Sequence, residues 1–279
     1  MSAAEFSDTA ALPPTEPPGA VGALWDRVIA LAQSLGDDDW QRPVPWCPAW
    51  NVADLVSHLG GLQSSLNGAE QPAMPDGWEP PPGASVFDAS MGPAVAARKS
   101  WTPQQRLDEL RSASDAHVAA LAAVEDWTEP IVGPTGQTTQ LGLYAQRSFD
   151  IWVHLQDLAE ALGRPVDTDD RTPAAAAAAL FVLNTVPWMF VKRAGAAEGA
   201  TMRVTLGPPV EHDSVLRVDN GRAAWDSAAD PGDCTLSATP AAFVLLLAGR
   251  GSPQRWRDND VLAWHGPRAT EFVERAGMF

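Results

Sequence analysis

The spacing of hydrophobic residues changes once along this chain of 279 residues, near residue 200. Before that point, apolar residues recur every three to four positions, which is the rhythm of helices that bury one face. We expect helices over residues 19–35, 52–66, 86–100, 103–124, 139–162 and 172–194. This region therefore predicts a helical bundle, with no strand between residues 20 and 160.

Beyond residue 200 the sequence has short segments of alternating or β-rich character. Asn220-Gly221 is a strong hairpin turn signal, and helices are expected over 240–248 and 267–276. Gly163 with Pro165 behind it should end the helix before the connection. The predicted fold class is α+β, with a bundle over 19–165, a connecting helix over 166–199 and a smaller α+β domain over 200–279.

Composition excludes some classes of partner. A formal net charge of −16, with no cluster of basic residues, argues against nucleic acid. No apolar run approaches the roughly 20 residues of a membrane span, and the proline-containing start lacks the pattern of a secretory signal, so we expect a cytoplasmic protein with an unstructured lead-in. Cys47 and Cys234 are expected neither to bond to each other nor to ligate a metal.

The segment "CPAWNVADLVSHLG" places a histidine on a helix that should face the core. Asn51 is a good N-cap, and the helix from Val52 has an apolar stripe that His58 joins or borders. A buried imidazole needs a hydrogen-bond partner or a metal ion. A core histidine bonded to a carbonyl and a metal ligand are both compatible with this segment.

The helix over 139–162 carries residues that could complete a metal site. Asp150 and His154 are four residues apart, so they lie on one face, and Asp157 follows on the same side. With His58 from a facing helix, Asp150 and His154 would form a three-ligand site with an open fourth position, as in catalytic zinc centres. The alternative is a solvated charged face, because such pairs also arise by chance.

Three motifs resemble one family. "CPAWNVADLVSHLGG" is similar to the "PGWTVRDLVAHL" signature, and "DIWVHLQDLAEALGRP" to the "ExxxHxxDLxxALG" helix, of the mycothiol-dependent maleylpyruvate isomerase family. "DCTLSATPAAFVLLLAGR" is similar to the strand, helix and Gly-Arg ending of its second domain. The resemblance implies a DinB-like four-helix bundle followed by a sterol-carrier-like α+β domain. It also implies that His58, Asp150 and His154 are metal ligands, usually for zinc.

The chain departs from the family at one proposed ligand. The family commonly has Glu where this chain has Asp150, which is one methylene shorter. The helix would then have to approach the ion more closely, or the metal preference would change.

The resemblance also implies an activity. A metal-bound thiol loses its proton, and the family presents mycothiol, a small cysteine-containing sugar thiol, as a thiolate to an electrophile. Cis–trans isomerisation and S-transfer are both compatible with the motifs. Asp157 would orient a ligand histidine or an arginine, although a surface carboxylate is equally compatible.

Other residues are weaker candidates for the same site. Arg250 matches the family's Gly-Arg and could be catalytic or cap a helix end, and Arg222 could reach an anionic substrate. Trp50 and Trp152 lie near the ligand motifs in sequence and could form walls of the binding site.

Two rival functions remain compatible with the sequence. A metal-dependent hydrolase would hold an activated water at the open position, but Val153 and Leu155 flank His154, so no neighbouring general-base Glu is evident. A non-catalytic carrier would instead bind an apolar ligand in the C-terminal domain.

Overall fold

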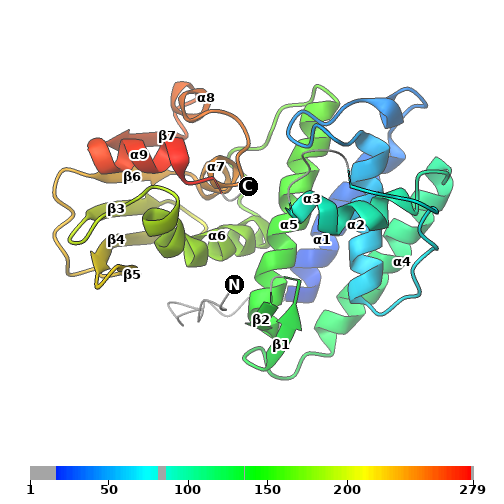
Figure 1. Ribbon diagram of the computed structural model, residues 1–279, viewed down its shortest axis with the longest axis horizontal. Coiled ribbons are helices and arrows are strands. Elements are labelled where there is room, and N and C mark those ends of the chain that lie inside the picture. The colour runs from blue at the N-terminus through cyan, green and yellow to red at the C-terminus, as the bar shows by residue number, and fades with distance from the viewer. Residues whose placement is uncertain (1–16, 81–85, 135, 278–279) are drawn as a thin grey trace. The chain divides into compact units, whose positions relative to one another are not determined.

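The computed structural model describes residues 17–80, 86–134 and 136–277 (Figure 1). This part of the chain divides into two compact units. We call residues 17–125 and 154–166 the helical unit, and residues 126–153 and 167–277 the mixed unit. Helix α5 (Gln140–Ala161) is continuous and contributes to both. The lead-in expected before residue 17 lies outside the described residues.

The helical unit is built from α1 (Pro17–Gln33), the short 3-10 helix η1 (Asp39–Gln41), α2 (Val52–Leu66), α3 (Val86–Ala96), α4 (Pro103–Ala122) and the end of α5. Helix α4 packs against α1 and α2, and α2 also packs against α3. Trp25, Leu55 and Leu110 are fully or almost fully buried in the core. The predicted bundle of helices is confirmed here.

Helix α2 begins where the sequence predicts. The Asn51 side chain accepts a hydrogen bond from the Asp54 backbone N–H at 2.9 Å, and the Asp54 carboxylate accepts one from the Asn51 N–H at 3.2 Å. This capping box satisfies two donors that a helix start otherwise leaves without a partner. It therefore fixes the helical phase that turns His58 into the core.

The expectation that residues 20–160 contain no strand is wrong. Strands β1 (Pro130–Gly133) and β2 (Gly136–Thr139) form an antiparallel hairpin directly before α5, with Ile131 opposite Thr138. The β-branched side chains of Ile131, Val132 and Thr138 favour extended backbone. Four residues per strand are too few to show alternation clearly, so the helical rhythm on either side dominates the pattern.

The mixed unit contains α6 (Pro173–Lys192) and a five-stranded sheet. The strand order is β5-β4-β3-β6-β7, and β3 and β6 are the parallel pair. Their bounds are β3 Thr201–Leu206, β4 His212–Asp219, β5 Arg222–Trp225, β6 Thr235–Ala238 and β7 Leu262–His265. The β4–β5 hairpin turns at Asn220 and Gly221, both with positive φ (52° and 72°), which confirms the predicted turn.

Three further helices complete the mixed unit, namely α7 (Pro240–Leu247), α8 (Pro253–Asp258) and α9 (Pro267–Arg275). All eight residues of α7 are buried, and the helix packs against α6. Helix α8 and strand β7 are additions to the sequence-based expectation. The predicted α+β character of the C-terminal region is confirmed.

Helix α6 lies within the predicted range 172–194, but it is more apolar than the sequence analysis allowed. An 18-residue stretch of this 20-residue helix has a mean hydropathy of 1.8, which meets the length and composition criteria for a membrane span, but 61% of that stretch is buried inside the protein. Val182 and Val186 have no exposed surface. The structure therefore accounts for its hydrophobicity as that of a core helix.

Candidate metal centre

Two histidines from different helices meet inside the helical unit. His58 on α2 is 0% exposed and His154 on α5 is 7% exposed. Their ring centroids lie 5.0 Å apart at an interplanar angle of 81°, so the edge of one imidazole faces the other. The inward direction predicted for His58 is confirmed.

Asp150 lies one turn before His154 on the same uninterrupted helix. His58, Asp150 and His154 each offer a ligand atom, and these atoms all lie within 4.8 Å of one another. The structure therefore brings together the three residues that the sequence predicts as ligands. Two imidazole nitrogens and one carboxylate oxygen make up a donor set that zinc uses in proteins.

The Asp150 carboxylate has an arginine partner that sequence reasoning missed. Arg147 Nη1 donates to Asp150 Oδ2 at 2.7 Å, and the Arg147 side chain is only 2% exposed. Burial lowers the pKa of Arg147, and the negative charge of Asp150 acts in the opposite direction. The i, i+3 spacing of the pair was visible in the sequence, but the burial of the guanidinium was not.

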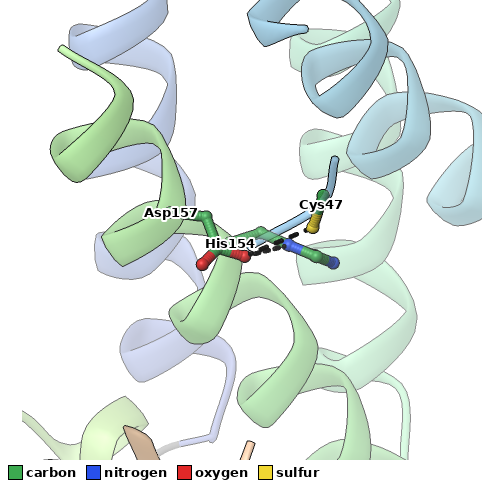
Figure 2. Close-up of side chains that lie close together, drawn as sticks. All are labelled: Cys47, His154 and Asp157. Atoms are coloured by element: carbon green, nitrogen blue, oxygen red, sulfur yellow. Dashed lines mark hydrogen bonds and ion pairs between the residues drawn. The ribbon is translucent and has the colours of Figure 1, made fainter. Parts of the chain in front are cut away.

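The carboxylate of Asp157 contacts the Nδ1 edge of the His154 ring (Figure 2). Asp157 Oδ2 lies 2.9 Å from His154 Nδ1, and Asp157 is 0% exposed, so it is no surface carboxylate. An ionised carboxylate only accepts hydrogen bonds, so we assign the imidazole proton to Nδ1. This tautomer leaves the lone pair of Nε2 for a ligand.

Cys47 reaches the same carboxylate from the loop before α2. Its Sγ donates to Asp157 Oδ2 at 3.8 Å, and Figure 2 shows both side chains directed toward His154. Cys47 is half-buried and Cys234 is buried, and neither is in a disulfide, which confirms the expectation that they are not bonded to each other. Cys47, His154 and Asp157 form a second group whose ligand atoms lie within 4.8 Å of one another.

The loop that presents Cys47 also presents Trp50. The Val44 N–H donates to the Trp50 carbonyl at 3.0 Å and the Trp50 N–H to the Cys47 carbonyl at 2.8 Å, which closes the loop on itself. Trp46 Nε1 donates a hydrogen bond to Glu160 Oε2 at 2.5 Å, which links the loop to α5. The Trp50 ring centroid is 4.9 Å from that of His58, so this tryptophan lies against the centre.

The remaining predicted residues have other surroundings. Trp152 is fully buried and donates to Asp170 at 2.9 Å. Arg250 is 8% exposed, and its Nη1 donates to the Ala248 carbonyl at 2.6 Å. Arg222 is exposed at the start of β5. All three belong to the mixed unit.

The motifs and the paired histidines define a helical domain with a candidate metal site, and comparison with known families identifies the domain. Residues 21–159, about half of the chain, match the family described as the mycothiol maleylpyruvate isomerase N-terminal domain. The chain belongs to this family.

Solved structures extend the likeness beyond this domain. A crystal structure of a histidine-to-alanine mutant of the mycothiol-dependent maleylpyruvate isomerase is similar, with a TM-score of 0.54 and 16% identity. A second crystal structure of the mycothiol-dependent maleylpyruvate isomerase gives 0.52 and 17%. Each comparison covers 94% of this chain and 95% of the other, so the shared fold includes the C-terminal region. No curated protein sequence matches.

Proposed function

We propose that this protein is a metal-dependent enzyme that presents mycothiol, a low-molecular-weight thiol, as a thiolate to a small electrophile in the cytoplasm. The observation that carries the proposal is the convergence of His58, Asp150 and His154 within a domain of the mycothiol maleylpyruvate isomerase family. The reaction would be cis–trans isomerisation or S-transfer.

The donor set fits a zinc ion. Imidazole nitrogen and carboxylate oxygen are both zinc ligands, and three protein ligands leave one position of a tetrahedron for an exogenous group. A structural zinc site would be closed by a fourth protein ligand. Asp150 has the shorter side chain, but its position one turn before His154 brings its carboxylate to the imidazole pair.

The charges near the histidines favour an anionic ligand. Asp150 and Asp157 supply two negative charges and Arg147 one positive charge, so a divalent cation would bring the cluster to a net charge of about +1. A cation there would lower the pKa of a coordinating thiol, so that the thiol binds as a thiolate. Thiolate binding would then neutralise a buried cluster, which is favourable in a low dielectric.

The chain's own residues would orient and shield this chemistry. Asp157 holds the proton on His154 Nδ1, and Trp50 covers His58 with an apolar ring that limits water. In isomerisation the thiolate adds to a conjugated double bond, the new single bond rotates, and elimination returns the thiolate and a trans alkene. In S-transfer the carbanion formed by the same addition would take up a proton from solvent, and the thioether would be released.

The test measures both the binding of metal and thiol and the turnover of a substrate. Native mass spectrometry of the full chain with zinc and mycothiol should show a ternary complex, and maleylpyruvate should be consumed only when the thiol is present. His58→Ala and His154→Ala should each lose both results, while His265→Ala, which changes an exposed histidine at the end of β7, should keep them. Thiol-independent ester hydrolysis would instead indicate the hydrolase, and a chain unable to take up metal would indicate the carrier.

A further inference from the structure

A sulfur ligand lies beside the proposed centre but outside its ligand set. We propose that Cys47, His154 and Asp157 form a second metal-binding position, which takes thiophilic divalent ions such as Cd²⁺ and competes with the His58–Asp150 pair for His154. All three residues belong to the helical unit, and Figure 2 shows their side chains converging. The inference goes beyond the proposed function, because neither mycothiol nor catalysis is needed for it.

The separations suit one ion. Asp157 Oδ2 lies 2.9 Å from His154 Nδ1 and 3.8 Å from Cys47 Sγ. Zinc ligands lie about 2.0–2.3 Å from the ion, so ligand atoms about 3–4 Å apart can share one ion with small side-chain adjustments. The two hydrogen bonds to Asp157 are then replaced by bonds to the metal. The thiol proton is released to solvent, and the imidazole proton moves from Nδ1 to Nε2, so the ring stays neutral.

The ligands of the second position differ in charge and softness from the first set, which consists of His58, Asp150 and His154. A thiolate and a carboxylate together balance a divalent cation, whereas His58, His154 and Asp150 supply one negative charge. Neutrality matters here because Asp157 is fully buried and His154 nearly so. Thiolate sulfur also favours soft ions over hard ones, so the second position should prefer Cd²⁺ most strongly.

His154 belongs to both ligand sets, which makes them competitors. One imidazole can bind an ion through each nitrogen only by losing both ring protons, which is costly for a side chain that is normally neutral or cationic. Occupation of the second position through Nδ1 therefore disfavours an ion at the first position. An excess of thiophilic ion should displace metal from the His58 set rather than add to it.

Cadmium reports the sulfur bond directly. Metal-free full-length protein is titrated with Cd²⁺ while the ultraviolet thiolate-to-cadmium charge-transfer absorption is recorded. The band should saturate at about one ion per chain. Cys47→Ser should lose the band, and Asp157→Asn should weaken Cd²⁺ binding by about tenfold or more. Cys234→Ser is the matched control, because the chain's other thiol is buried in the mixed unit, and it should keep the band.

Two further variants separate this proposal from the proposed function. Asp150→Asn and His58→Ala remove ligands of the first set only, so both should keep the charge-transfer band even where thiol-dependent activity is lost. Circular dichroism checks that each variant is folded. Absence of the band in the wild type, its persistence in Cys47→Ser, or its loss in Cys234→Ser would overturn the second position. Unchanged Cd²⁺ affinity in Asp157→Asn would do so as well.

Discussion

The guanidinium of Arg147 lies 2.7 Å from the carboxylate of Asp150, and the two residues lie on the same face of α5, two turns and one turn before His154 respectively. The arginine is 2% exposed and the aspartate 18% exposed, so the ion pair is largely removed from water. Burying two charges is costly, and their mutual attraction compensates only when both are present. The pair therefore makes the stability of the helix depend on a residue of the proposed metal centre.

We expect Arg147→Met to destabilise the metal-free protein by about 3 kcal/mol, because it leaves the Asp150 charge buried without its guanidinium. Asp150→Asn should also destabilise, since it leaves the Arg147 charge without its counterion. The double variant should be clearly more stable than the sum of the two losses predicts. Urea unfolding of the four proteins measures this coupling, and strictly additive losses would show that the pair contributes nothing.

The length and charge of Asp150 should have separate effects on the metal. Asp150→Asn removes the only charged ligand among His58, Asp150 and His154. We expect the zinc affinity to fall by about 100-fold or more, because losing even a residue that only contacts a ligand typically costs about 10- to 100-fold. Asp150→Glu restores the family's usual residue and should keep zinc. Competition with a chromophoric chelator measures both affinities. Asp169→Asn, a carboxylate on the surface, is the control. Equal zinc affinity in the wild type and Asp150→Asn would remove Asp150 from the ligand set.

Much of this centre is readable from local sequence rules. The capping residue Asn51 sets the phase of α2, and that phase turns His58 inward. The four-residue spacing of Asp150 and His154 places them on one face of α5. Both inferences need only helical geometry, which is why they succeed.

The parts that sequence reasoning missed depend on distant segments or on very short elements. Cys47 reaches Asp157 because its loop is closed by backbone hydrogen bonds and tied to α5 through Trp46 and Glu160, which are 114 residues apart. No local pattern encodes that contact. The hairpin before α5 has strands of four residues each, too short for a recognisable period.

A glycine of α2 is required by the arginine packed on it. A Cβ at Gly61 would lie 2.7 Å from Arg98 Cζ. Arg98 cannot move aside easily, because it is fully buried and donates to both Glu109 oxygens at 2.6 and 2.5 Å. We expect Gly61→Ala to destabilise by about 1–3 kcal/mol.

The matched control for that substitution is Gly22→Ala on α1. Its Cβ would meet no atom closer than 3.6 Å, so the gain in helix propensity should stabilise by about 0.5–1 kcal/mol. Urea unfolding compares the two variants with the wild type. A Gly61→Ala variant as stable as Gly22→Ala would mean that Arg98 repacks without cost.

His212 gives the mixed unit a dependence on pH. It lies on β4, and the centroid of its ring is 4.5 Å from that of Trp225. Its Nε2 is buried without a hydrogen-bond partner among the described residues. Burial lowers the pKa of His212, and neighbouring Asp213, itself bound to Arg203, only partly opposes the shift.

The sign of the effect follows from the lowered pKa. Above the ordinary histidine pKa of about 6.5, His212 is neutral in both the folded and unfolded states, and its titration costs no stability. As the pH falls below that value, the unfolded chain takes up the proton first, so the folded state loses stability until the lower folded pKa is passed. We expect His212→Gln to lose less stability than the wild type between about pH 7.5 and about pH 5.5. Thermal unfolding of the metal-free proteins measures the difference, with His265→Gln as an exposed control. If His212→Gln and the wild type lose stability equally over this range, the proton is taken up elsewhere, and burial of His212 has no part in the acid sensitivity of the mixed unit.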